Sequence, residues 1–159
     1  MPRLICLIAF LFSGILLYSQ GKKELRANKV ASETTLVNET VNGENLQYKE
    51  LYTVYDKNGN VLEETEFNPD GSIKRKEVNL YNKENQKTEE QVTNSKGKVK
   101  VTKYLYNNGG EKIGEIEYDS EGTIIKQTAY FYDNKGLKTE KKVFDGNKKL
   151  LSTKKYIYT

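Results

Sequence analysis

One short phrase recurs along most of the chain and restricts its possible folds more than any other feature. The phrase is usually an aromatic residue, then Asp or Asn, two polar residues and Gly. Its eight copies begin at Tyr55, Phe67, Tyr81, Thr93, Tyr106, Tyr118, Tyr132 and Phe144. Neighbouring copies are 12 to 14 residues apart and alternate copies 25 or 26. The repeat is therefore about 26 residues long and contains two half-units.

Each half-unit is predicted to be a tight turn followed by a strand. Asp or Asn can hydrogen-bond its own backbone two residues on, and Gly accepts positive φ without steric cost. A type I turn that ends in a left-handed Gly is a common hairpin connection, so these glycines should have positive φ: Gly59, Gly97, Gly122 and Gly136. Between turns, apolar residues alternate with polar ones, for instance in residues 99–106, which is the period of a strand. No segment shows a convincing helical stripe.

The fold class expected from this pattern is all-β. Strands are predicted near residues 47–55, 60–67, 73–81, 87–93, 98–106, 112–118, 124–132, 138–144 and 149–158. Connections this short force each strand to run antiparallel to the one before it. The expected fold is an antiparallel meander of about nine strands built from ~26-residue double-hairpin repeats, covering residues 47–159. The sheet should be open and twisted, or partly rolled.

The two faces of this sheet should differ at one end. Alternate strands end in an apolar residue followed by Tyr: Val54-Tyr55, Leu80-Tyr81, Leu105-Tyr106, Phe131-Tyr132 and Ile157-Tyr158. Neighbours on a strand point to opposite faces, so one face should be aliphatic and the other rich in tyrosine. Tyrosine suits stacking on sugar rings or anchoring a protein, although the same row could simply pack the core. The candidate ligand-binding residues are Tyr104, Tyr106, Tyr130, Tyr132, Tyr156 and Tyr158.

Residues 1–20 have the layout of a cleavable secretory signal peptide. Arg3 precedes an uncharged apolar run over residues 4–17, and the composition turns polar at Gly21. A transmembrane anchor is the alternative, but fourteen residues are too few to span roughly 30 Å of hydrocarbon. We therefore expect an exported protein, periplasmic, on the outer surface or extracellular, that meets the membrane only through its signal peptide. Residues 21–46 lack the repeat and should form a polar linker with a possible edge strand.

The composition excludes several kinds of chemistry. The chain has no His or Trp, and its single Cys, Cys6, lies in the predicted signal peptide. Catalytic triads, Cys/His zinc sites and thiol redox chemistry are thereby excluded from the mature chain, and neither a metal nor a cofactor is expected. A carboxylate pair for glycoside hydrolysis is the enzymatic alternative, although its candidates are spread among lysines on strands. These candidates are Glu63, Glu64, Glu89, Glu90, Glu115 and Glu117.

Calcium and nucleic acid are not expected ligands either. The Asp- and Asn-rich turns do not match an EF-hand loop, because Gly59 falls at the fourth position instead of the sixth. Residues 21–159 carry a net charge of +3, with Lys and Glu interleaved, which indicates no concentrated basic stripe. Turn formation and solubility explain these side chains.

The Tyr-Asp-x-x-Gly phrases at Tyr55, Tyr118 and Tyr132 resemble the YD repeats of the RHS class. The copies at Phe67, Thr93, Tyr106 and Phe144 fit the same spacing, so the resemblance covers residues 47–158. A weaker similarity is to MORN-type hairpin repeats, whose additional glycines this chain mostly lacks. The resemblance implies a secreted β-repeat scaffold, and related repeats have been linked to carbohydrate binding. Only about four double units are present.

The function expected from these features is a non-catalytic interaction module of the cell envelope or exterior. A protein partner is the preferred interpretation. A carbohydrate-binding module that uses an exposed tyrosine ladder is the alternative. The two differ in whether the tyrosine side chains are accessible in the folded protein.

Overall fold

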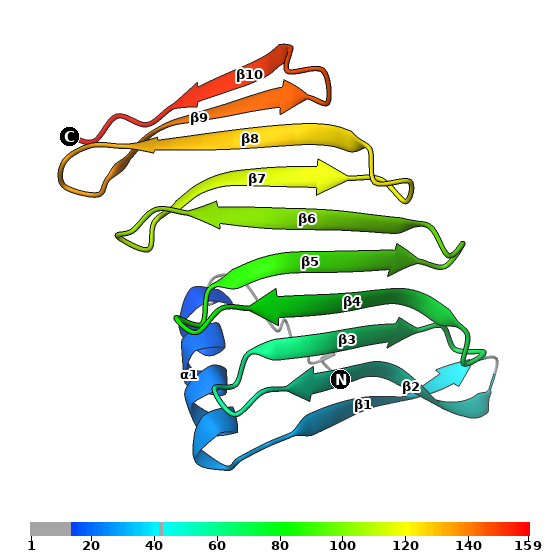
Figure 1. Cartoon of the computed structure of the whole chain (residues 1–159). Coiled ribbons are helices and arrows are strands. Elements are labelled where there is room, and N and C mark those ends of the chain that lie inside the picture. The colour runs from blue at the N-terminus through cyan, green and yellow to red at the C-terminus, as the bar shows by residue number, and fades with distance from the viewer. Residues whose placement is uncertain (1–13, 42) are drawn as a thin grey trace, which may run out of the picture.

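The computed structural model describes residues 14–41 and 43–159, and the described part contains one helix and ten strands (Figure 1). The elements are α1 (Gly14–Ala27), β1 (Ser32–Val41), β2 (Glu44–Tyr55), β3 (Val61–Phe67), β4 (Ile73–Tyr81), β5 (Lys87–Asn94), β6 (Val99–Tyr106), β7 (Lys112–Tyr118), β8 (Ile124–Tyr132), β9 (Lys138–Asp145) and β10 (Leu150–Lys155). The strands form a single antiparallel sheet in chain order. The predicted all-β meander is confirmed, and the sheet is open.

The sequence predicted nine strands, and the structure has ten. The additional strand is β1, which lies in the segment expected to be a polar linker with a possible edge strand. It pairs with β2 from Ser32 opposite Val54 to Val41 opposite Glu44 and forms one edge of the sheet. Nearly all of its side chains are exposed. An edge strand exposed on both faces needs no alternation of apolar residues, so the sequence pattern did not mark it clearly.

The helix α1 is the element that the sequence did not predict. It begins inside the predicted signal peptide, continues past residue 20, where that peptide is expected to end, and stops at Ala27. Residues 1–13, which make up most of that predicted signal peptide, lie outside the described residues. Within residues 14–41 and 43–159, no helix is both long and apolar enough to span a bilayer.

The end of α1 follows from its sequence. Residues 22–27 are Lys, Lys, Glu, Leu, Arg and Ala, all of them good helix formers. Lys29 then takes a left-handed φ of 52°, and the Val30 N–H donates to the Leu25 carbonyl at 3.0 Å. This is the αL ending that many helices use to satisfy their last carbonyls. It turns the chain back toward β1.

The turns share one hydrogen-bond pattern, seen after β2. The Gly59 N–H donates to the Asp56 carbonyl at 3.0 Å, and Asp56 Oδ1 accepts from the N–H groups of Asn58 and Asn60, both at 2.8 Å. The four glycines predicted to have positive φ do so: Gly59 (74°), Gly97 (74°), Gly122 (80°) and Gly136 (75°). Asn85 and Lys148 occupy the same place in two other turns, at φ of 61° and 65°.

A register shift recurs where β2, β4, β6 and β8 each reach their final tyrosine. It lies between Leu105 and Tyr106 in β6, and at the equivalent step in the other three strands. One extra residue in the following strand is left out of the pairing, so Tyr106 faces Lys112, the first residue of β7. Such bulges increase the local twist of a sheet. They also place the first residue of the following strand, such as Lys112, on the same face as the final tyrosine.

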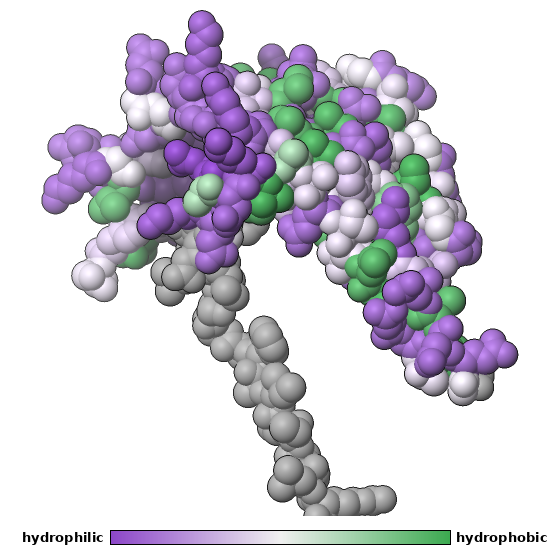
Figure 2. Space-filling view, turned by 90° about the horizontal axis from the view of Figure 1, so that it is seen from below, coloured by the Kyte–Doolittle hydropathy of each residue, from purple (hydrophilic) through white to green (hydrophobic). Residues whose placement is uncertain are grey.

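The interior of this single-layer sheet is polar. Among the described residues, Tyr130 is the only buried residue with a hydrophobic side chain, and the buried polar residues in the strands are Thr53, Thr65, Asn79, Thr102 and Thr128. These short side chains lie between long Lys, Glu and Tyr side chains that cover them on each face. Figure 2 accordingly shows hydrophobic residues scattered among hydrophilic ones on the side seen from below. The sheet is held by its ladders and by cross-strand pairs more than by a hydrophobic core.

Candidate functional site

We call the face that carries Tyr55, Tyr81, Tyr106 and Tyr132 the tyrosine face, and the face that carries Val54, Leu80, Leu105 and Phe131 the aliphatic face. The pairing register supports this division, because Tyr104 lies opposite Glu115, which in turn lies opposite Thr128 of β8. Tyr104 and Tyr130 therefore lie on the tyrosine face beside Tyr106 and Tyr132.

The outer row of the tyrosine face consists of Tyr81, Tyr106, Tyr132 and Tyr158, and it links neighbouring strands beside the turns. Each hydroxyl reaches across to the carbonyl of the first residue of an earlier strand, about twenty positions back in sequence. The bonds are Tyr81 to Val61 (3.1 Å), Tyr106 to Lys87 (2.8 Å), Tyr132 to Lys112 (2.7 Å) and Tyr158 to Lys138 (2.8 Å). These hydroxyls donate to backbone oxygens of the sheet itself. These four tyrosines thus have a structural role in the fold.

The inner row of the tyrosine face, Tyr104 and Tyr130, donates hydrogen bonds to carboxylates. The Tyr104 hydroxyl donates to Glu90 Oε2 at 3.2 Å, and the Tyr130 hydroxyl donates to Glu115 Oε1 at 3.0 Å. Burial raises the pKa of Tyr104, and the neighbouring charge of Glu90 raises it further. Burial and Glu115 raise the pKa of Tyr130 in the same way. Both phenols therefore stay protonated and act as hydrogen-bond donors.

All six predicted site residues lie on the C-terminal part of the tyrosine face or in the tail after β10. They differ in accessibility: Tyr130 is buried, Tyr104, Tyr106, Tyr132 and Tyr156 are half-buried, and Tyr158 is 56% exposed. Five of their hydroxyls make the bonds described above. The six rings are thus gathered on one face, but most of their surface and their polar tips are used within the fold.

Lysines and carboxylates fill the space between the tyrosines. Lys87 Nζ lies 3.0 Å from Glu90 and 3.3 Å from Glu77, and Arg75 lies 2.5 Å from Glu77. Burial opposes ionisation of Glu77, but hydrogen bonds from Asn79, Arg75 and Lys87 outweigh it and lower its pKa. On β7, Glu117 accepts from Lys126 at 2.6 Å. These carboxylates are satisfied members of a charge network.

The carboxylates proposed for glycoside hydrolysis are divided between the faces. Glu63 and Glu89 lie on the aliphatic face, where they pair with Lys76 at 2.9 Å and Lys103 at 3.9 Å. Glu90, Glu115 and Glu117 lie on the tyrosine face with the partners given above. The sixth candidate, Glu64, lines a separate pocket.

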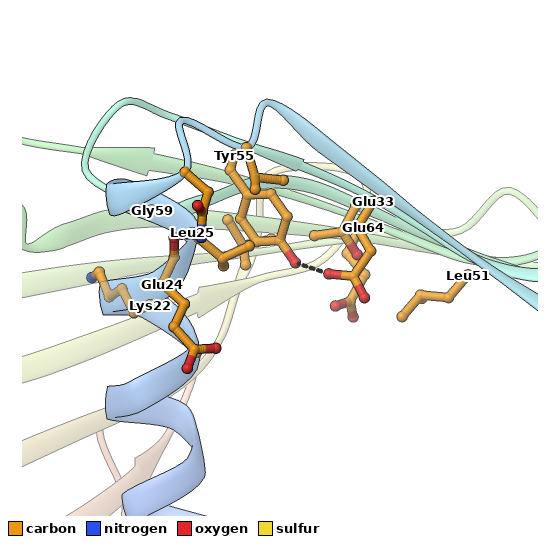
Figure 3. A pocket seen from close by; sticks show the side chains of 13 residues that line it. Lys22, Glu24, Leu25, Glu33, Leu51, Tyr55, Gly59 and Glu64 are labelled. Atoms are coloured by element: carbon orange, nitrogen blue, oxygen red, sulfur yellow. Dashed lines mark hydrogen bonds between the residues drawn. The ribbon is translucent and has the colours of Figure 1, made fainter.

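This pocket lies between α1 and the N-terminal end of the tyrosine face (Figure 3). It has a volume of about 660 Å³, and its apolar wall includes Leu25, Leu51 and Val61. Glu33 and Glu64 lie close together at one side of it, and the Tyr55 hydroxyl donates to Glu33 Oε2 at 3.0 Å. Its chemistry suits a small ligand with an apolar body and a cationic group.

Burial and nearby charges raise the pKa values of Glu64 and Tyr55 in the pocket. Burial raises the pKa of Glu64, and the charge of Glu77 adds to the effect. Burial and the hydrogen bond to Glu33 raise the pKa of Tyr55 to about 12. Lys22 of α1 donates to Asn60 Oδ1 at 2.5 Å and so ties the helix to the turn beside the pocket. This pocket was not predicted from the sequence, because it depends on where α1 lies.

A second feature, a change of net charge along the chain, was not predicted although the sequence contains it. The net charge of +3 averages two unlike parts. Residues 21–134 contain 17 Lys and Arg against 20 Asp and Glu, a net −3, while residues 135–159 contain eight lysines against two acidic residues, a net +6. The interleaving of Lys and Glu therefore ends in the last repeat.

No group of His, Cys, Asp or Glu suited to a metal ion occurs among residues 14–41 and 43–159.

Comparison with known proteins identifies no relative. No family model matches the chain, and no curated protein matches it. Two solved structures of TarM, one of them an S. aureus mutant in complex with Fondaparinux, alpha-GlcNAc-glycerol and UDP, show 17% and 16% identity, each with a TM-score of 0.33. They cover 89% of this chain, which spans 24% of theirs. A protein of unknown function from Bacteroides fragilis shows 12% identity over 82% of this chain and 96% of its own, at a TM-score of 0.24. Scores this low support no argument about function.

Proposed function

We propose that this protein is a non-catalytic, exported interaction module that binds a protein partner through its aliphatic face. The observation that carries the proposal is a row of exposed apolar side chains, one from every second strand: Leu80 is 53% exposed, Leu105 45% and Phe131 43%. Ile157 continues the series in the tail after β10 and is 89% exposed. Exposed apolar rows rimmed by polar groups are typical of protein interaction sites.

The rim of this row is charged. Glu89 lies opposite Leu80, and Glu140 lies opposite Phe131. Lys142 Nζ lies 5.0 Å from the centre of the Phe131 ring. Apolar anchors separated by charged residues match the mixed composition of interfaces between proteins that also exist apart.

The proposed absence of catalysis is supported by the state of the carboxylates. Apart from Glu64, the candidates on the strands pair with lysines or accept hydrogen bonds from tyrosine hydroxyls, so their oxygens already have partners within the sheet. The resemblance to YD repeats points the same way, because it implies a scaffold. The pocket under α1 offers acidic groups, which suits binding of a cation.

The binding proposal is tested with a photo-crosslinking residue placed at Leu105 and expressed in intact cells. We expect a discrete crosslinked product from the envelope fraction. Excess purified wild-type protein should compete it away, and the Leu80→Ser/Phe131→Ser variant should not. The matched control is Tyr158→Ser, an exposed change near the same end, which should compete like the wild type. Equal competition by the aliphatic-face variant, with its fold verified by circular dichroism, would refute the proposed interface.

Export is tested separately by N-terminal sequencing of the protein from the envelope or culture medium. The first residue should be Gln20 or Gly21, because the apolar run ends there. Cleavage would leave residues 21–27 to form the part of α1 that contacts the sheet. Cytosolic protein that retains Met1 would contradict export.

A carbohydrate-binding module that stacks neutral sugars on an exposed tyrosine ladder has less support. Tyr130 is buried, and the hydroxyls of the outer row donate to backbone carbonyls. Lysine ammonium groups also lie over several of the rings. The tyrosine face therefore presents positive charge above its aromatic rings in the last repeat.

A further inference from the structure

A cationic surface arises at the C-terminal end of the tyrosine face through one change in the repeat. The third residue after the start of β5 is Glu90, which pairs with Lys87, and the same position in β7 is Glu115, which pairs with Lys112. In β9 the equivalent pair is Lys138 and Lys141. The repeat thus keeps its lysine and replaces the carboxylate that would neutralise it.

Three lysines make up this surface, which we call the open lysine cluster: Lys138, Lys141 and Lys154. Lys154 of β10 lies directly opposite Lys141 of β9. Within the part of the chain that the structure describes, none of the three forms an ion pair with a carboxylate. Lys138 and Lys141 are half-buried and Lys154 is exposed, so solvent reaches all of them.

The acidic groups near the cluster have other partners. Glu115 accepts from Lys112 and from the Tyr130 hydroxyl. Asp145 Oδ1 accepts the N–H groups of Asn147 and Lys149 in its own turn, both at 2.9 Å. Glu140 pairs with Lys142 at 3.2 Å. The positive charge of the cluster is therefore available to a ligand.

Aromatic rings hold these lysines in place without neutralising them. Lys138 Nζ lies 4.4 Å and Lys141 Nζ 5.7 Å from the centre of the Tyr130 ring, and Lys154 Nζ lies 5.3 Å from that of Tyr156. A cation over a ring keeps its charge and its hydrogen-bond donors. Preordering of the side chains reduces the entropy lost when a ligand binds.

We propose that the open lysine cluster binds an anionic polysaccharide, a chain of sugar rings that carries regularly spaced carboxylate or sulfate groups. The cluster spans two adjacent strands on an open sheet face, which suits an extended polymer. The half-buried rings of Tyr132 and Tyr156 provide apolar surface beside the charges, where a sugar ring can pack. The net +6 of residues 135–159 attracts a polyanion from a distance. The inference rests on the export proposed above, because export would place the protein where envelope and extracellular polysaccharides are.

The test is isothermal titration of the chain starting at Gly21 with polygalacturonate at low and physiological salt, with neutral dextran as a control. The wild type should bind polygalacturonate and not dextran. The triple variant Lys138→Gln/Lys141→Gln/Lys154→Gln should lose affinity by at least about tenfold. The matched variant Lys57→Gln/Lys83→Gln/Lys96→Gln removes the same charge from exposed turns and should change affinity by less than about twofold.

A single substitution gives an independent readout. Lys141→Glu restores the carboxylate of the earlier repeats, so it should remove most of the binding while leaving thermal stability unchanged or higher. Equal losses in the two triple variants would show attraction by net charge alone and overturn the proposal. So would poly-L-glutamate binding as tightly as polygalacturonate, or no binding of polygalacturonate. The crosslinking test probes the opposite face, so the two proposals fail separately.

Discussion

The N-terminal and C-terminal halves of the tyrosine face are built from the same repeat and have opposite character. Near α1 the face is acidic, carries Glu33 and Glu64 in a pocket, and is partly covered by the helix (Figures 1 and 3). Near β9 and β10 it is basic, carries three lysines over tyrosine rings, and has no helix against it among the described residues. A repeat fixes the backbone and leaves side-chain chemistry free to vary. The protein uses that freedom to make two different surfaces on one sheet.

The two halves also differ in what fills the inner row. The position held by Tyr104 and Tyr130 in the later repeats is Asn79 in β4 and Thr53 in β2. Asn79 is 1% exposed, its amide group donates to Glu77 at 2.9 Å, and its Oδ1 accepts no hydrogen bond among the described residues. A small polar side chain in the first half thus corresponds to a large aromatic one in the second.

The largest expected effect tests this difference at one repeat position. Tyr130→Ala deletes the only buried hydrophobic side chain of the described residues and should lower the free energy of unfolding by roughly 3 kcal/mol or more. Asn79→Ala, at the equivalent position, should cost only about 1 kcal/mol, because it removes one hydrogen bond and an unsatisfied oxygen. Urea unfolding of both variants measures the two values. Equal costs would show that the halves do not differ in how they are stabilised.

A smaller effect concerns the helix that covers one half. Gly59 and Gly122 each end an Asx turn, with φ of 74° and 80°, but a Cβ at Gly59 would lie 3.0 Å from the Lys22 carbonyl of α1, whereas nothing lies within 4 Å at Gly122. Gly122→Val should cost about 1 kcal/mol through left-handed strain alone. Gly59→Val should cost roughly 2 kcal/mol, because it also displaces the helix. If thermal melting finds the same loss for both, α1 does not contact the sheet as described.

The third effect concerns a lysine placed in β7 at the position where β9 already has one. Glu115→Lys removes the acceptor of the Tyr130 hydroxyl and the partner of Lys112, so it should cost about 1 to 2 kcal/mol. Glu121→Lys makes the same change of charge in an exposed turn and should cost less than about 0.5 kcal/mol. Chemical unfolding of the two variants gives the comparison. Similar values would mean that the charge network on the tyrosine face contributes nothing specific.

The smallest effect runs in the opposite direction. Lys141→Glu gives Lys138 the carboxylate that Lys87 and Lys112 already have, so it should stabilise the fold by about 0.5 kcal/mol, as expected for a partly exposed ion pair. Lys135→Glu makes the same change of charge in the exposed turn before β9 and serves as the control. Differential scanning calorimetry at low salt is the sensitive measurement. A lower melting temperature for Lys141→Glu would argue against the assignment of these repeat positions.

Most of the sheet could be predicted from the sequence because its signals are local. The Asx–Gly turns and the alternation between them placed β3, β4, β7 and β8 to within a residue of their observed ends. The same alternation predicted which tyrosines share a face, and the pairing register agrees. β1 and α1 lack that alternation: one is an exposed edge strand, and the other is a short helix that overlaps the predicted signal peptide.

The candidate site was predicted only in part. The sequence placed Tyr130 and Tyr158 in one ladder, but one is buried and the other 56% exposed. That difference depends on neighbours on the adjacent strands, such as the lysines over the Tyr130 ring, whose positions are set by the bulges at the start of β7 and β9. Periodicity determines on which face of the sheet a side chain lies, but not which neighbouring side chains cover it.

The sequence by itself determined the repeat, the antiparallel meander, the turn glycines and the division into two faces, because each follows from interactions within a few residues of chain. The tertiary structure alone decided where α1 lies, which carboxylates pair with which lysines, and which tyrosines stay accessible. Those outcomes depend on contacts across strands, and the pairing register with its bulges sets the neighbours of each side chain. The open lysine cluster needed both: its lysines are plain in the sequence, and their lack of carboxylate partners appears only when the strands are paired.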